Sequence, residues 1–557
     1  MTIKLIAFDK LRLANLLRQP HFIYTGNVQI AEQSYSQYSI HHTMRKIFFI
    51  LTFIVPSSML FAQEPADALR SSWIISSGTA RQQAVGGAMA SLGGDLSAAY
   101  VNPAGLGFYK TGDFVLTPGF NLLKNKSTYY GRTEQDKKNS ISFGTTGVVL
   151  GTGTTSGKKK GGMAVALAIN RTASFGSNIL YRGANTQNSY SQKFLEEIKN
   201  KNDKDANSVA GNYPFGTSLA FNTYWIDTIA GGTSGNYQFQ SRATIGNLLQ
   251  ENTVINRGGI TELALAFAGN SKDKFYFGGT IGIPFLHYEK EATFTEADGT
   301  ANTNNKFDFA SITENLTTNG NGINVKMGII YKPVEYVRLG LAIHTPTFYM
   351  MTDRYNASVT TNTEAYKGSL TQESGLFTNG TDAEFKYWMV TPYRIMASAS
   401  YVLREIEDVR KQKGFLTADI EYVNYKASSF STDPEGDNSQ STKDYLKSLN
   451  RAIDNAYKAA FNFKAGGELK FTTIMARLGV AYYGNPYKDL GKGEKGSRFS
   501  VSGGLGYRNK GMFIDLTYVH TMGKDVHYAY RLQNTAFSGA SIKQTGGNAL
   551  LTVGFKI

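Results

Sequence analysis

Several short patterns in this 557-residue sequence have the spacing of ligand-binding motifs. Residues 491–496 fit the G-x-G-x-x-G pattern of a phosphate-binding loop, but they stand between two expected strands rather than between a strand and a helix. Residues 203–207 carry oxygen ligands at the spacing of a calcium loop, yet Ser208 replaces the required glycine and Pro214 the bidentate glutamate. Both segments are therefore interpreted as solvated loops.

No set of residues assembles into catalytic machinery. The chain has no cysteine, which excludes thiolate nucleophiles and thiolate metal sites, and it has no G-x-S-x-G motif. Its histidines lack zinc-type spacing. Asp419 and Glu421 share one face of an expected strand and resemble a general acid/base pair, but ion pairing with nearby basic side chains is the preferred interpretation. We predict no enzyme, no catalytic residue, no metal and no cofactor.

The elements that position these residues are strands. Residues 323–331 and 336–343 alternate apolar with polar or small side chains on either side of a short turn at 332–335, which predicts a β-hairpin. Comparable segments place fourteen strands near 112–122, 138–150, 161–172, 259–269, 274–290, 322–332, 336–349, 388–404, 414–429, 460–471, 474–486, 497–508, 511–521 and 547–557. Glycine (58 residues) and aromatics (13%) are abundant, which favours strands and turns over helices.

Three features distinguish a membrane barrel from a soluble sandwich. Short and long connections alternate, aromatic residues such as Tyr331 and Tyr336 flank the short turns, and the inward faces are polar. Five basic residues fall on those inward faces and are candidate lumen charges: Lys326, Arg338, Arg394, Lys464 and Arg477. Because lipid tolerates no open sheet edge, the sequence predicts an all-β membrane protein, a closed antiparallel 14-stranded transmembrane β-barrel.

The N-terminal region contains a secretion signal. Met44-Arg45-Lys46 precedes a short apolar run, and Ala62 is a small residue before a polar segment. We predict that residues 1–43 are a mis-assigned upstream extension and that 44–62 form a signal peptide. Residues 63–111 follow, and 112–557 form the barrel with its long extracellular loops. The net charge of +15 is spread along the chain, which argues against nucleic-acid binding and favours an anionic lipid surface.

Residues 63–111 have no strand period and are rich in small residues. They are expected to fold inside the barrel as a plug, with a periplasmic tail as the alternative. The motif Asn102, Pro103, Ala104, Gly105 is expected to bend the chain where the plug meets the wall, because proline fixes φ and asparagine favours turns. Short helices are expected in the long connections 173–258 and 430–459, either as an apolar entry site or simply packed on the loops.

Short motifs spread over residues 65–557 resemble the FadL/TodX family of outer-membrane transporters for long-chain fatty acids and other hydrophobic compounds. The motifs are Asn102-Pro103-Ala104-Gly105-Leu106, the segment 340–347 (GLAIHTPT), Thr391-Pro392-Tyr393-Arg394, Arg477-Leu478-Gly479 with Asn485-Pro486-Tyr487, and the segment 504–508 (GLGYR) before Ile514-Asp515. The resemblance implies a fourteen-stranded barrel, an N-terminal hatch in the lumen, and lateral exit of ligand at a kink in the third strand. That strand is 161–172 here, and Ala164, Ala166 and Ala168 on its inner face leave room for such a path.

The resulting functional hypothesis is passive uptake of hydrophobic molecules, of the fatty acid or hydrocarbon type, across the outer membrane of a Gram-negative bacterium. The expected partners are hydrophobic small molecules or lipids, outer-membrane lipid and lipopolysaccharide, and the barrel-assembly machinery, with the protein itself a monomer. The alternatives are a structural or adhesive outer-membrane barrel and an outer-membrane lipid enzyme.

Overall fold

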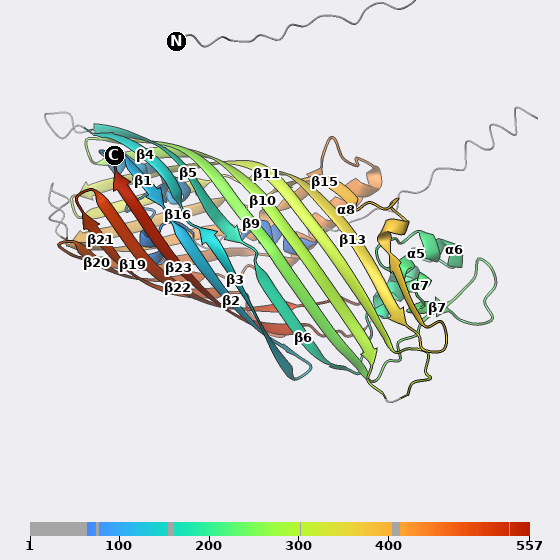
Figure 1. Ribbon diagram of the computed structural model, residues 1–557. Helices are drawn as coiled ribbons and strands as arrows, with labels where there is room; N and C mark the ends of the chain where they lie inside the picture. Colours follow the sequence, from blue (N-terminus) through green and yellow to red (C-terminus); the bar gives the residue numbers. More distant parts are fainter. Residues whose placement is uncertain (1–63, 74–76, 154–160, 301, 404–412, 534) are drawn as a thin grey trace, which may run out of the picture. The chain divides into compact units, whose positions relative to one another are not determined.

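The computed structural model describes residues 64–557 except 74–76, 154–160, 301, 404–412 and 534. The predicted upstream extension and signal peptide lie outside the described residues. One continuous sheet of 21 strand segments closes on itself, and these segments form fourteen antiparallel barrel strands (Figure 1). Closure is made by the last segment, whose Phe555 and Gly554 pair with Phe114 and Val115 of the first.

Several barrel strands are interrupted and consist of two segments in line. The wall segments are β1 (Asp113–Leu116), β2 (Pro118–Tyr129), β3 (Arg132–Phe143), β4 (Thr146–Gly153), β5 (Gly161–Ser174), β6 (Ser177–Asn185), β9 (Leu248–Ser271), β10 (Phe275–Asp298), β11 (Phe309–Val334), β12 (Val337–His344), β13 (Phe348–Asn362), β14 (Ser369–Glu373), β15 (Ala383–Val390), β16 (Arg394–Leu403), β17 (Gly414–Asn424), β18 (Ser429–Thr432), β19 (Ala459–Phe471), β20 (Ile474–Tyr483), β21 (Arg498–Asn509), β22 (Met512–His527) and β23 (Ala540–Lys556). A small separate sheet pairs β7 (Ile226–Thr228) with β8 (Phe239–Ser241).

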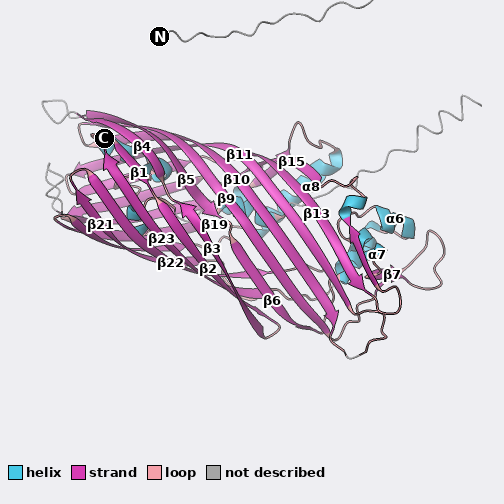
Figure 2. Cartoon of the chain, viewed as in Figure 1, coloured by secondary structure: helices cyan, strands magenta, loops and turns pink. Residues whose placement is uncertain are grey.

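Helices lie at two levels of the barrel (Figure 2). The N-terminal segment forms α2 (Pro65–Ser72), α3 (Ala80–Ala84), α4 (Ala98–Val101) and the 3-10 helix η1 (Pro103–Phe108), all enclosed by the strand wall. The long connections carry α5 (Ser191–Lys201), α6 (Ala206–Gly211), α7 (Thr217–Asn222) and α8 (Gln440–Ala456), with short 3-10 turns η2 (Ser374–Leu376) and η4 (Tyr425–Ala427). No helix among the described residues is long and apolar enough to cross a membrane.

The outer face of the wall matches a bilayer. On β10, Phe275, Phe277, Ile281, Ile283 and Phe285 are all exposed, whereas the alternate residues are mostly buried. Because water would disfavour such a continuous exposed apolar surface, its solvent is lipid. Aromatic residues line the short-turn end, where the Phe275 and Tyr331 rings stack at 4.6 Å. The barrel is therefore of the outer-membrane type.

The predicted strand positions are confirmed, but predicted strands such as the sixth are too short at the end that faces the long loops. The sixth strand, expected at 322–332, is β11 and begins at Phe309. Its additional residues pair with β10 and β13 over their whole length. Above the apolar belt the outward face meets water, so both faces carry polar side chains and the period-two hydrophobic signal disappears.

Candidate functional site: the hatch and the lumen above it

The N-terminal segment from residue 64 to 111, hereafter the hatch, is bonded to the inner wall by groups from several strands. The carboxylate of Asp419 on β17 accepts the backbone N–H groups of Met89 (3.0 Å) and Ala90 (3.1 Å). Thr517 on β22 donates to the Ala80 carbonyl at 2.7 Å. The two bonds to Asp419 satisfy hatch N–H groups that are not bonded within a helix or a sheet ladder.

The predicted bend at Asn102 is a junction between hatch and wall. The side chain of Asn102 is 1% exposed. Its Nδ2 donates to the carbonyl of Ala90 within the hatch (2.6 Å) and to that of Ile329 on β11 (3.2 Å), while its Oδ1 accepts the N–H of Ala104 (3.1 Å). Pro103 occupies the first position of η1, where its missing N–H leaves no bond unmade. Asn102 therefore caps η1 and ties the hatch to the wall at the same time.

Small wall residues allow this close approach. A Cβ added at Gly340 of β12 would lie 2.3 Å from the Ala90 carbonyl oxygen, and one added at Gly278 of β10 would lie 2.4 Å from the Pro103 carbonyl carbon. Both distances are much shorter than a van der Waals contact, so a side chain at either position would clash with the hatch. The hatch backbone therefore packs directly against the backbone of the wall near residues 103–105. Ala104 and Gly105 are buried there.

The five candidate lumen charges all face inward; four are buried and Lys464 is half-buried, and none is left as a bare cation. Lys326 bonds to Glu262, Arg394 (2.7 Å) and Lys464 (2.8 Å) both bond to Glu421, and Arg477 bonds to Glu468 and Asp515 at 2.6 Å each. Arg338 donates to the Leu92 carbonyl of the hatch at 2.7 Å and stacks over Phe108.

The ion-pair interpretation of the two acidic residues on β17 is confirmed for Glu421 and wrong for Asp419. Asp419 holds hatch amides instead, together with the hydroxyl of Ser398. Sequence reasoning also missed Glu262 and Glu468 as ion-pair partners, although both lie on the inward parity of their strands. These ion pairs therefore join the inward faces of different strands across the lumen.

The three alanines assigned to a lateral path lie under the hatch. Ala164, Ala166 and Ala168 of β5 are at most 2% exposed and belong to one apolar cluster with Tyr100 and Leu106 of the hatch. The space that their short side chains leave is filled by hatch residues. An exit along this strand therefore has to lie farther from the short turns than these alanines.

Above the hatch, toward the long loops, lies a large apolar cluster, hereafter the upper cluster. Its wall members are mostly aromatic or sulfur-containing and include Tyr288, Tyr349, Met351, Tyr387, Met389 and Phe430. Ala68 and Leu69 of α2 project into it from the hatch, and Leu446, Leu449 and Ile453 of α8 cover it. The helix expected in 430–459 thus turns its apolar stripe into the lumen. Its first turn is capped by Ser439, whose side chain accepts the N–H of Thr442.

A second apolar cluster caps the barrel mouth. Phe194 and Ile198 of α5 pack with Tyr190 and Trp225, and burial raises the pKa of the Tyr190 phenol to about 12. The carboxylate of Glu296 at the end of β10 accepts the Trp225 indole N–H at 3.0 Å. This part of the long loop therefore has a core of its own and is not a loose lid.

On one side of the wall two neighbouring strand segments, β3 and β6, lie next to each other without backbone pairing in the described part of the chain, and this boundary is hereafter called the seam. Among the described residues no backbone ladder joins β3 to β6, whereas β4 and β5 below them are paired from Thr146 to Gly153. The third strand breaks at Phe175 and Gly176, between β5 and β6. Across the seam the strands are joined by side chains, including the ion pair of Arg182 with Glu134 (3.0 Å).

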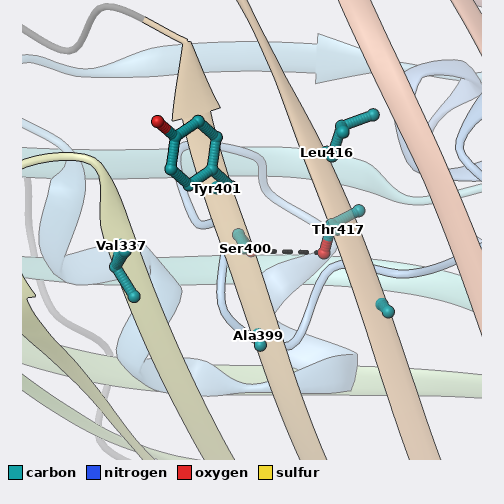
Figure 3. A pocket seen from close by; sticks show the side chains of 7 residues that line it. Val337, Ala399, Ser400, Tyr401, Leu416 and Thr417 are labelled. Carbon is teal, nitrogen blue, oxygen red and sulfur yellow. Dashed lines mark hydrogen bonds between the residues drawn. The ribbon is translucent and has the colours of Figure 1, made fainter.

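A shallow depression elsewhere on the wall is not part of the lumen. It is lined by Val337, Tyr401, Leu416 and neighbouring residues of β12, β16 and β17 (Figure 3). Tyr401 and Leu416 are 49% and 60% exposed on the outer face, while Ser400 donates to Thr417 at 3.2 Å on the inner side. The depression therefore opens toward lipid.

The fold and the hatch define a plugged outer-membrane barrel. No family model and no curated protein matches the sequence. Among solved structures, a FadL homologue of Pseudomonas aeruginosa matches with a TM-score of 0.50 and 12% identity, over 86% of this chain and 99% of that chain. The toluene transporters TodX of P. putida (TM-score 0.46, 11% identity, 87% and 99% covered) and TbuX of Ralstonia pickettii (0.47, 11%, 87% and 99%) also match.

At this identity the first match establishes the fold alone. The chain has the fold of FadL-type barrels, and the resemblance seen in the sequence motifs is confirmed at that level.

Proposed function

We propose that this barrel takes up hydrophobic molecules passively across the outer membrane and releases them sideways through the seam between β3 and β6. The observation that carries the proposal is the continuity of the upper cluster with the break in the third strand. Phe175, at the break, packs against that cluster, and its ring contacts Tyr288 edge-on at 5.6 Å. An apolar path therefore runs from the upper cluster to the gap in the wall.

The direction of release follows from the packing below the upper cluster. The straight route to the short-turn end is filled by the hatch, which is hydrogen-bonded to the wall through Asp419, Thr517 and Asn102. A hydrophobic ligand gains nothing from the polar, ion-paired lumen around the hatch. Release into lipid at the seam needs no change in the hatch, and it breaks side-chain contacts rather than a backbone ladder.

The upper cluster is the proposed ligand site. In the structure α2 occupies part of it, with Leu69 5% exposed and the Arg70 guanidinium 3.8 Å from the centre of the Tyr288 ring. A ligand entering from the long loops would take the place of these α2 side chains. Partitioning into such an aromatic and methionine-rich environment needs no cofactor and no energy source.

Reversible locking of the seam tests the proposal. A Cβ at Gly176 would lie 4.0 Å from Cγ of Lys138 on β3, so Lys138→Cys with Gly176→Cys should form a disulfide across the seam. The chain has no other cysteine. The control pair is Thr128→Cys with Thr133→Cys, which joins β2 and β3 where they already pair.

Uptake of a radiolabelled long-chain fatty acid and of toluene is measured in cells that lack other such transporters. Oxidation should abolish uptake through the seam pair and spare the control pair, and a reductant should restore it. Uptake that persists with the seam disulfide formed would exclude this exit. Wild-type cells that take up neither compound would contradict the proposed function itself.

A further inference from the structure

A group of lysines lies on the outer face of four neighbouring strands, and hereafter these residues are the lysine patch: Lys124 and Lys126 on β2, Lys137 on β3, Lys543 on β23 and Lys524 on β22. All five are exposed. Their strands are adjacent in the order β3, β2, β23, β22. The patch therefore covers one side of the barrel next to the seam.

The register places these lysines directly opposite one another. Lys124 pairs with Lys137, Lys126 pairs with Lys543, and Lys543 pairs with Lys524. Directly opposed side chains on one face have Cβ atoms about 4.5–5.5 Å apart, and like charges at that distance repel. Among the described residues one carboxylate meets the patch, that of Glu494, 3.0 Å from Lys524. The other four ammonium groups have no acidic partner there.

The patch sits at the upper edge of the apolar belt. On β2 the outward residues before Lys124 are Phe120 and Leu122, 43% and 40% exposed. On β22 they are Leu516, Tyr518, His520 and Met522, followed by Lys524. Because the long loops extend beyond this edge, the ammonium groups lie at the headgroup level of the outer leaflet.

Outward charges are arranged differently on β9, β10, β13 and β15. There Arg257 faces Glu289 and Glu291, each at 3.9 Å, and Arg354 bonds to Glu384 at 3.1 Å. Positive and negative side chains therefore alternate on those strands, whereas positive side chains accumulate at the lysine patch. A repulsive arrangement of this kind is relieved by a multivalent anion that contacts several lysines at once.

We propose that the lysine patch binds the phosphorylated headgroup of an outer-leaflet glycolipid, with its acyl chains lying along Phe120, Leu122 and Leu516 below. The headgroup phosphates bridge the opposed lysines of β2, β3 and β23. The lipid so held stands beside the seam between β3 and β6. The inference depends on the outer-membrane location and not on the proposed uptake.

Native mass spectrometry of the full-length protein in detergent tests the proposal with diphosphorylated lipid A as the probe. The patch variant is Lys124→Gln/Lys126→Gln/Lys543→Gln. The matched control is Lys443→Gln/Lys447→Gln/Lys458→Gln, which removes the same charge from exposed positions in and just after α8. A third variant replaces the three patch lysines by arginine and keeps the charge.

Wild type, control and arginine variant should retain the lipid, and the patch variant should bind it roughly tenfold or more weakly, since each lysine near an anionic surface contributes measurably. Lipid A stripped of phosphate should bind the wild type as weakly as lipid A binds the patch variant. Without lipid, the patch variant should be at least as heat-resistant as the wild type, because repulsion is removed.

Two results would overturn the proposal. One is equal lipid A binding by the patch and control variants. The other is displacement of the lipid by millimolar inorganic phosphate, which would show that the lysines attract any phosphate and do not form a glycolipid site.

Discussion

Replacement of Asn102 by alanine isolates the anchor between hatch and wall. The variant loses the donor to the Ala90 and Ile329 carbonyls and the acceptor of the Ala104 N–H, all in a side chain that is 1% exposed. No strand-to-strand hydrogen bond is removed. The barrel wall should therefore persist while the hatch becomes easier to detach.

The size of the effect follows from the lost bonds. Buried groups left without partners cost about 1–3 kcal/mol each, and part of this is recovered when the hatch shifts or water enters, so a net loss of about 2–3 kcal/mol is expected. Since about 1.4 kcal/mol is a factor of ten in a population, the detached state should become roughly 30- to 140-fold more populated.

Single-channel recording in planar bilayers measures that population directly. Wild type should be nearly silent, the Asn102→Ala variant should show brief openings at increased frequency, and deletion of residues 63–107 should give a steady conductance that sets the upper limit. Asn139→Ala, an exposed asparagine on the outer face of β3, is the control. Heat-modifiable migration on gels checks that each barrel has folded.

Two outcomes would refute this reasoning. If Asn102→Ala is as silent as the wild type while the deletion conducts, Asn102 does not anchor the hatch. If the wild type already shows a large stable conductance that the deletion leaves unchanged, the hatch does not close the lumen and the barrel is an ordinary porin.

Three further predictions concern topology, processing and stability. An epitope tag within 173–258 should be accessible to antibody on intact cells and one within 405–413 should not; the reverse labelling would invert the barrel. N-terminal sequencing of the exported protein should begin at Gln63, and a sequence beginning near residue 1 would disprove export by this signal. Arg477→Met should lower the thermal midpoint strongly, because about 3–5 kcal/mol is typically lost when one member of a buried ion pair is removed and its carboxylate partners stay buried. A midpoint within 1 °C or so of the wild type would contradict that role.

The sequence revealed the barrel because lipid imposes a pattern on every strand. Wherever the outer face meets hydrocarbon, as at Phe275 to Phe285, apolar residues must alternate, and the alternation can be read without knowing the neighbours. The same argument fails above the belt, where β11 continues to Phe309 with polar residues on both faces. The period-two hydrophobic pattern therefore indicates where a strand contacts lipid, and it does not indicate how long the strand is.

The interior could be predicted only in part. Parity along each strand identified which charges face inward, including Lys326 and Arg477, but not their partners. Glu262 lies 64 residues from Lys326, and the amides that bind Asp419 lie about 330 residues away. Such pairs depend on the register of many strands and on where the hatch settles, and neither is encoded in a local pattern.

The alanines of β5 show the limit of an inference from one strand alone. Their small size does create space, as expected from Ala164, Ala166 and Ala168, but the hatch fills it with Tyr100 and Leu106. Space in a wall becomes a path only where nothing else is packed. The break in the third strand lies at Phe175 and Gly176, just beyond the expected end of that strand at residue 172, so the resemblance indicated the interrupted strand and the alanines did not.

The strands of the wall are paired differently at the level of the hatch and at the level of the seam. Where the hatch touches the wall, glycines such as Gly340 and buried polar groups such as Asp419 fix backbone against backbone, and every strand there is paired. At the height of the upper cluster the hatch supplies α2 and Trp73, and no ladder joins β3 to β6 among the described residues. A barrel of fourteen strands cannot lose a ladder at both levels and remain closed in lipid. The rigid lower half, held by its hatch, is therefore what allows the wall above it to carry a gap.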